Sequence, residues 1–127
     1  MKEQLITFDT AKLAKEKGFN GLSQMRYNED GVLTGTKLGM HNKPNSYVGS
    51  FASPTQSLLQ KWLRDTHNID VDIWCNASGW AFNLNKTNGT TIYSYDYYFG
   101  NIDSGMFNSY EEALEQGLQE ALKLIKI

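Results

Sequence analysis

Six polar or aromatic side chains alternate along three strand-like segments of the chain: Asp72, Trp74, Asn83, Ser94, Asp96 and Tyr98. The carboxylates, the amide and the hydroxyl among them can hydrogen-bond a ligand, and the two aromatic rings beside them can stack on it. This set is therefore the first candidate binding site, suited to a small ligand such as a nucleotide. The alternative interpretation is an ordinary solvent-exposed sheet face, or a face covered by another hairpin.

A second candidate is the basic loop that carries Lys37, His41 and Lys43. Its segment, residues 37–46, is polar and contains a glycine and a proline, which predicts a mobile loop. A flexible basic loop can close over an anion. The alternative is a loop whose charges are simply solvated.

The chain carries no recognisable catalytic or metal-binding motif. Neither histidine is paired with a nucleophile in a known spacing. Asp70, Asp72 and Asp96 lie on different strand-like segments, with no loop that would bring their carboxylates around a metal ion. The single cysteine, Cys75, falls on an apolar face and is expected to be a small buried hydrophobic residue. We expect no catalytic residue, no metal and no cofactor, and a protein that is not an enzyme.

Length and composition favour one α+β domain over residues 1–127. Hydrophobic residues make up 40% of the chain, enough to form a core without disulfides or metal. The formal net charge of −2 argues against a partner held through its phosphates, so nucleic acid is not expected. No apolar run approaches the about 20 residues of a membrane span, and the first residues do not form a secretory signal. A soluble, cytoplasmic protein is expected.

Three alternating segments predict an antiparallel meander over about residues 69–99. The four-residue turn 76–79 and the Asn88-Gly89 turn fix its register, pairing Ile73 with Phe82 and Phe82 with Tyr95. One face then carries three apolar rows: Val71–Leu84–Tyr93, Ile73–Phe82–Tyr95 and Cys75–Trp80–Tyr97. The other face is largely polar, with rows such as Asp70–Asn85–Ile92, and holds the first candidate site.

Helix-capping residues, among them Thr7 and Ser109, predict three helices, over about residues 8–17, 54–67 and 110–125. Ser53, followed by a proline and then Gln56, predicts the start of the second helix. The second and third helices are amphipathic, and the second has one apolar stripe, formed by Leu58, Leu59, Trp62 and Leu63. The Tyr93 side of the meander is the only large apolar surface for the two helices to cover. Gly117, within the third helix, predicts a close approach to a neighbouring element. The short first helix is expected to pack at an edge.

The N-terminal part predicts a hairpin. Residues 24–28 pair with residues 32–36 across a three-residue loop that ends in Gly31. Residues 47–51 are expected to form a short edge strand that leads into the second helix.

Three segments, TAKLAKEKGF, SPTQSLLQKWLRDTHNI and YEEALEQGLQEALKLI, occur at the start, middle and end of the chain. In this combination the chain resembles a group of small uncharacterised proteins encoded by phages and prophages of gut bacteria. The resemblance covers about a third of the chain and implies location in the host cell cytoplasm. It assigns no activity, because the matching residues are mostly helix caps and core positions.

Together these features predict a non-enzymatic protein-binding module, a phage-type accessory protein that acts on a host protein. The alternative is a small-ligand binder, such as a nucleotide-sequestering protein that uses the polar sheet face. A third hypothesis is a small hydrolase without a known motif. A small homo-oligomer is compatible with each of these hypotheses.

Overall fold

The computed structural model describes residues 3–36, 42–87, 91–95 and 107–126, and for residues 91–95 it describes the backbone only. The helices are α1 (Phe8–Glu16), α2 (Gln56–His67) and α4 (Tyr110–Lys123), with a short 3₁₀ turn, η1 (Pro44–Ser46). The strands are β1 (Met25–Tyr27), β2 (Leu33–Gly35), β3 (Phe51–Ala52), β4 (Ile69–Asn76), β5 (Gly79–Lys86) and β6 (Thr91–Tyr95). The expected α+β class is confirmed.

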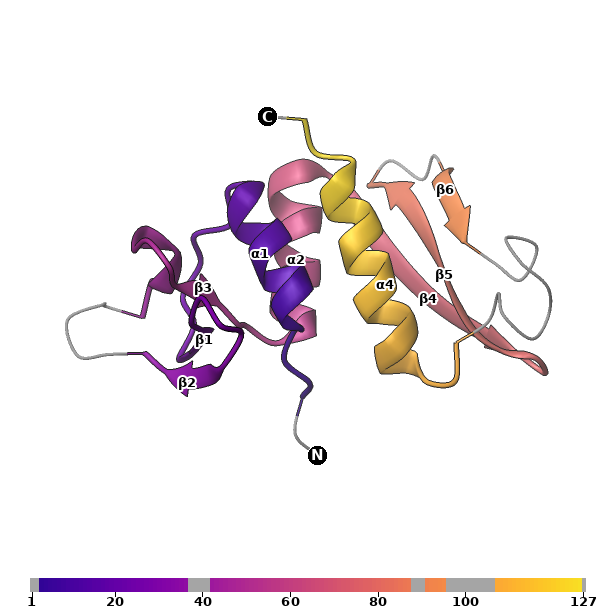
Figure 1. Ribbon diagram of the computed structural model, residues 1–127. Coiled ribbons are helices and arrows are strands. Elements are labelled where there is room, and N and C mark those ends of the chain that lie inside the picture. The colour runs from indigo at the N-terminus through magenta and orange to yellow at the C-terminus, as the bar shows by residue number, and fades with distance from the viewer. Residues whose placement is uncertain (1–2, 37–41, 88–90, 96–106, 127) are drawn as a thin grey trace.

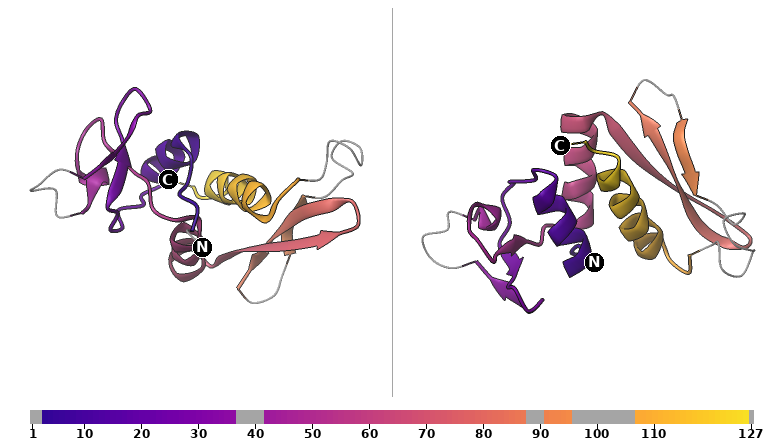
Figure 2. Two further views of the ribbon diagram at one scale, coloured as in Figure 1. Left: turned by 90° about the horizontal axis from the view of Figure 1, so that it is seen from below. Right: turned by 45° about the horizontal axis from the view of Figure 1, so that its top comes forward.

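The strands form two antiparallel sheets, with the strand orders β2-β1-β3 and β4-β5-β6. Figures 1 and 2 show the three helices side by side between the two sheets, with their N-terminal ends toward the same end of the molecule. The expected position of α1 at an edge is wrong, because α1 contacts both α4 and β3. The helices, rather than one sheet, are therefore the centre of the fold.

The β4–β5 hairpin has the predicted register along its whole length, from Ile69 opposite Lys86 to Asn76 opposite Gly79. Its apolar face is covered by α4, and Val71, Phe82 and Leu84 on that face are buried. A Cβ atom at Gly117 would lie only 2.7 Å from Val71 Cγ1 and 3.1 Å from the Phe82 ring. Glycine at this position therefore lets α4 lie directly on the sheet, as the sequence predicts.

The third strand departs from the predicted register at its beginning. Phe82, Asn83 and Leu84 pair with Tyr95, Ser94 and Tyr93 as predicted. Asn85 pairs with Thr91, however, and not with Ile92, because the register shifts between Leu84 and Asn85. An extra residue on one strand is a β-bulge, which alternation alone does not reveal. The rest of the predicted strand, residues 96–99, lies outside the described residues. The predicted pair Trp80–Tyr97 is wrong, because the Trp80 backbone pairs with Phe107, with hydrogen bonds of 2.9 and 2.8 Å.

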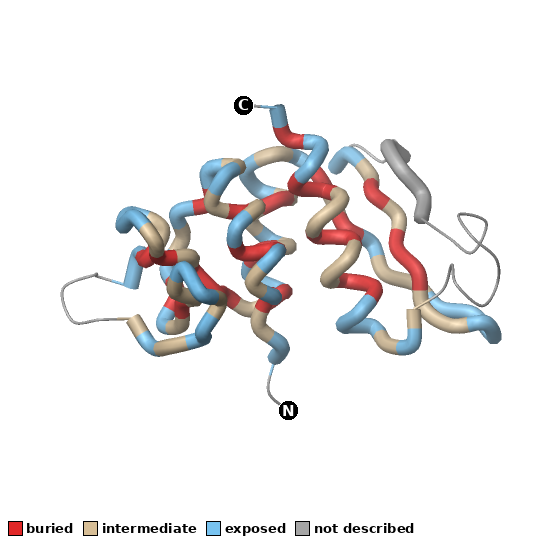
Figure 3. The backbone as a smooth tube through the Cα atoms, viewed as in Figure 1, coloured by how far each residue is buried: buried red, intermediate tan, exposed pale blue. Residues whose placement is uncertain are grey.

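The distal end of the β4–β5 hairpin corrects the assignment of Cys75. This residue pairs with Trp80 as predicted, yet Cys75 is exposed and Trp80 is only half-buried, packed edge-on against Tyr110 at 5.7 Å between ring centres. Figure 3 shows the exposed hairpin tip extending beyond the first turn of α4. The expectation of a buried Cys75 is therefore wrong, because Cys75 lies in the hairpin tip beyond the N-terminal end of α4, and the helix does not cover it.

Helix α2 begins two residues later than predicted. Its N-cap is Thr55, whose hydroxyl accepts a hydrogen bond from the Leu58 amide at 3.2 Å, and not Ser53. The N-terminal segment explains the difference, since the Ile6 amide donates to the Pro54 carbonyl at 3.0 Å and holds this stretch extended. The Ser53 hydroxyl is buried and donates to the Ile6 carbonyl at 3.2 Å instead of capping the helix.

The N-terminal hairpin is confirmed, with Arg26 opposite Thr34 and a positive φ of 80° at Gly31. The predicted strand at 47–51 is wrong except at its last residue, since only Phe51 and Ala52 form β3. Part of the predicted mobile loop is fixed in place, because the Asn45 side chain donates to the Phe19 carbonyl at 2.7 Å and accepts from the Ala52 amide at 2.7 Å. Residues 37–41 lie outside the described part of the chain.

Candidate functional site

The polar face of the β4–β6 sheet brings three of its six predicted site residues together. Asp72 lies directly opposite Asn83 on the neighbouring strand, and the Trp74 indole donates to Asn83 Oδ1 at 3.1 Å. Asp72 is exposed, whereas Trp74 and Asn83 are half-buried. This bond uses the indole N–H and one lone pair of the amide, so fewer groups remain for a ligand than the sequence suggests.

The structure describes less of the other predicted site residues. The backbone of Ser94 pairs with Asn83, and its side chain is not described. Asp96 and Tyr98 lie outside the described residues, as do Lys37 and His41 in the basic loop. Lys43 is exposed at the start of η1. Lys43 is therefore the one loop candidate that the described residues include.

In the described ranges no group of three or more His, Cys, Asp or Glu side chains is placed to hold a metal ion. The imidazole of His67 lies edge-on against Trp62, with the ring centres 4.8 Å apart. This contact places His67 at the C-terminal end of α2 as a packing residue.

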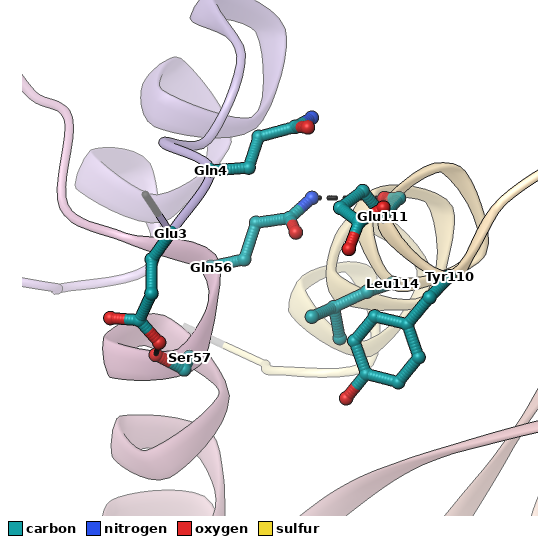
Figure 4. A pocket seen from close by; sticks show the side chains of 7 residues that line it. All are labelled: Glu3, Gln4, Gln56, Ser57, Tyr110, Glu111 and Leu114. Carbon is teal, nitrogen blue, oxygen red and sulfur yellow. Dashed lines mark hydrogen bonds between the residues drawn. The ribbon is translucent and has the colours of Figure 1, made fainter. Parts of the chain in front are cut away.

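A pocket of about 440 Å³ lies where the N-terminal ends of α2 and α4 meet (Figure 4). Two of the polar side chains that line it are bonded to other lining residues. Gln56 Nε2 donates to the Glu111 carbonyl at 2.9 Å, and the Ser57 hydroxyl donates to the Glu3 carboxylate at 2.5 Å. Acidic side chains beside helix N-termini stabilise the helices, so these residues have a sufficient structural role.

Beside this pocket, the carboxylate of Glu115 joins the three helices. Its Oε2 atom accepts from the Thr7 amide at 3.0 Å, from the Thr7 hydroxyl at 2.9 Å and from the Thr10 hydroxyl. Its Oε1 atom accepts from Gln56 Nε2 at 2.9 Å. A negative charge at this place offsets the positive ends of the helix dipoles that meet there. Sequence reasoning missed this network because its members are distant in the chain.

A different surface has the properties of a binding site: an apolar groove along α2, formed by two adjacent hollows of about 300 and 330 Å³. Leu22 and Leu58 line both hollows, and they are 61% and 42% exposed. Leu5 and Met25 extend the groove on one side, and Phe19 and Trp62 on the other. Large aliphatic side chains exposed next to one another mark interaction surfaces more often than isolated ones do.

The local sequence of α2 explains how the groove forms. Leu59 and Leu63 are fully buried in the core, whereas Leu58 is turned toward solvent. Trp62 lies between the buried and the exposed side of α2, and its ring packs edge-on against that of Phe19, with the ring centres 5.2 Å apart. The sequence prediction assigned Leu58, Leu59, Trp62 and Leu63 to one buried stripe. The stripe contains two adjacent apolar pairs, Leu58-Leu59 and Trp62-Leu63, so it is wider than the buried face of the helix. This extra width is the feature of the sequence that could have indicated the groove.

Charged residues form the rim of the second hollow. Lys61 and Asp65, one turn apart on α2, line it and form an ion pair. The hydrogen bond from Lys61 holds the pKa of the Asp65 carboxyl below its usual value, with further help from the nearby positive charges of Lys61 and Arg64. The groove thus combines an apolar floor with a solvated polar rim, which is the general anatomy of a protein–protein interface.

No family model, no curated protein and no solved structure matches this chain. Within the described residues, no helix has the length and apolar character needed to cross a membrane. The functional interpretation therefore rests on the geometry of the groove and on the chemistry of the residues around it.

Proposed function

We propose that this chain is a non-enzymatic protein-binding module whose binding surface is the apolar groove along α2. The observation that carries the proposal is the exposure of Leu22 and Leu58 side by side between two hollows. Covering exposed leucine surface lowers the free energy of the complex by about 25 cal/mol for each Å² of apolar surface removed from water. A partner with apolar side chains spaced to enter both hollows would be held here.

The shape of the groove favours a protein partner over a small molecule. Small-molecule sites enclose most of the surface of their ligand, whereas the leucines between these hollows remain largely open to solvent. The charged rim formed by Lys61 and Asp65 would stay at the edge of an interface, where it contributes to specificity more than to affinity. An amphipathic helix is one partner that fits, since its apolar residues recur on one side.

The resemblance to phage and prophage proteins supplies the kind of partner. We propose a phage-type accessory protein that acts in the host cell cytoplasm by binding a host protein. Such a protein needs a stable scaffold with one exposed apolar surface, and it needs no catalytic group.

The proposal is tested by photo-crosslinking in the cell that produces the protein. A benzoylphenylalanine placed at Leu58 is expected to give one dominant adduct with a partner protein, since this position lies between the two hollows. The same residue at Val48, which is 99% exposed and does not line either hollow, is the matched control. Equal adducts at the two positions, or none at Leu58, would contradict a specific groove.

The polar sheet face supports a second candidate function, binding of a nucleotide-like ligand. The bond between Trp74 and Asn83 holds the indole ring on this face beside the exposed Asp72 carboxylate. A thermal-shift screen with nucleotides separates the two functions, because a ligand that binds the native state raises the melting temperature by mass action. A shift that Trp74→Ala removes and Leu58→Glu leaves intact would favour this second function over the first.

A further inference from the structure

The outer half of β4 presents backbone groups at the edge of the second sheet that no described residue pairs. The Asn76–Gly79 pair closes a two-residue turn, so these residues exchange backbone hydrogen bonds, and every second residue of β4 does the same. Ile73 and Cys75, between those residues, therefore direct their N–H and C=O groups away from β5. The side-chain amide of Gln60 supports this alternation of inward and outward backbone groups, since it donates at 2.7 Å to the outward carbonyl of Val71, two residues before Ile73.

The two halves of this edge differ in whether helix α2 covers them. The inner half is covered by α2, through Gln60 on the Val71 carbonyl and Arg64 at 4.0 Å from the Asp70 carboxylate. The outer half, residues 72–76, has no such cover among the described residues. It also lacks proline, lysine and a β-bulge, three of the usual means by which proteins protect a sheet edge, and its single charged residue is Asp72.

We propose that two copies of this chain pair antiparallel through the outer halves of β4. The outward backbone groups of Ile73 then face those of Cys75 in the second copy, and the groups of Cys75 face those of Ile73 in the second copy. The two-fold axis passes between the two Trp74 residues. Each of these pairs exchanges both of its N–H···O bonds, as in any antiparallel ladder. The two β4–β6 sheets become one continuous sheet, so the dimer is a closed, isologous pair.

The side chains are compatible with this register. Asp72 lies opposite Asn76 of the second copy, so no two carboxylates face each other across the new ladder. Trp74 lies opposite its own copy at a non-hydrogen-bonded position, where side chains approach most closely. The inner end of β4, with α2 beside it, lies opposite the turn of the other hairpin. The helices of the two copies therefore stay at opposite ends, and the hairpin tip that extends past α4 in Figure 2 provides the room.

The paired segments are short, so the dimer is expected to be weak and concentration-dependent. Its interface is smaller than the about 1,200 Å² at which stable protein–protein interfaces begin. The proposal is separate from the proposed function, because the groove along α2 includes no residue of β4.

Disulfide trapping tests the two-fold axis. In the background Cys75→Ser, the variant Trp74→Cys places two thiols across a non-hydrogen-bonded pair, about 4.5 Å apart between Cα atoms, within disulfide range. The control Ser78→Cys lies on the exposed turn, where random collisions are more frequent. Trp74→Cys is expected to form covalent dimers about tenfold faster under a glutathione redox couple. Equal rates, or a faster reaction of Ser78→Cys, would overturn the proposal.

A second measurement removes a donor without altering a buried side chain. Cys75 is exposed and its N–H points outward, so Cys75→Pro leaves the β4–β5 ladder intact, as proline does on sheet edges. Sedimentation at high protein concentration is expected to show about tenfold weaker dimerisation for Cys75→Pro than for Cys75→Val, which keeps the donor. A wild-type protein that stays monomeric, or equal dimerisation of the two variants, would overturn the proposal.

Discussion

The carboxylate of Glu115, on α4, links this helix to the starts of α1 and α2. It accepts hydrogen bonds from the Thr7 backbone and side chain, from Thr10 and from Gln56, which belong to the starts of α1 and α2. Gln119, one turn further along α4, donates to Thr10 at 2.9 Å and extends the network. Hydrogen bonds to a charged group are stronger than those between neutral groups. We therefore assign this polar cluster a structural role.

Replacing Glu115 is expected to weaken the whole domain. Glu115→Ala removes the charged acceptor of the part-buried Thr10 hydroxyl and Gln56 amide and of the Thr7 backbone and side chain, and it is predicted to lower the free energy of unfolding by about 2–3 kcal/mol. The matched control is Glu120→Ala on the same helix, which loses mainly the ion pair with the exposed Lys123 and is predicted to cost less than about 1 kcal/mol. Urea unfolding followed by circular dichroism measures both. Equal, small effects would contradict the structural role of Glu115.

At the scale of elements, the contact between α4 and the β4–β5 hairpin fixes the second half of the molecule. Gly117 lets the helix backbone lie against Val71 and Phe82, both of which are buried. The rest of the α4 stripe, including Leu114, Leu118 and Leu122, fills the core.

Adding one methyl group at this contact is predicted to destabilise the protein. Gly117→Ala gains about 1 kcal/mol of helix propensity, but its Cβ would meet Val71 Cγ1 at 2.7 Å, and overpacking costs about 1–3 kcal/mol. Chemical denaturation is expected to show a net loss of stability. The double variant Gly117→Ala/Val71→Ala should lose less than the sum of the two single variants, because the smaller side chain relieves the clash. Strict additivity would place Gly117 away from the sheet.

Most elements were predictable because local signals and alternation agree on them. The caps Thr7 and Ser109 and the alternation of β4 and β5 predict these elements within a few residues. The start of α2 was not predictable, since the N-terminal segment that holds Pro54 extended is distant in the sequence. The exposure of Cys75 depends on where α4 begins relative to the hairpin tip, which periodicity does not contain.

The candidate site was harder to predict than the fold. Sequence reasoning selected polar and aromatic residues that alternate on strands, and of these the structure describes the side chains of Asp72, Trp74 and Asn83, which it brings together. The groove instead depends on Leu22, from a segment without regular structure, lying beside Leu58 of α2. Proximity between a loop and a helix is a tertiary property, so no local sequence pattern predicts it.

At the scale of the whole molecule, a three-helix layer separates two small sheets, and each part presents a different surface. The groove along α2 lies between the helix and the N-terminal segment, whereas the β4 edge belongs to the other sheet. A dimer formed through β4 would therefore carry two grooves. Two linked binding surfaces raise the apparent affinity for a partner that is itself repeated or clustered.

Binding of a protein in the groove along α2 is tested by the affinity of groove variants for the cross-linked partner once it is purified. Leu58→Glu and Leu22→Glu replace exposed side chains, so both should leave the melting temperature nearly unchanged. Calorimetry is predicted to show at least about a hundredfold weaker binding for each, as for central interface residues, and wild-type affinity for the control Val48→Glu. Wild-type affinity in Leu58→Glu and Leu22→Glu would contradict the account.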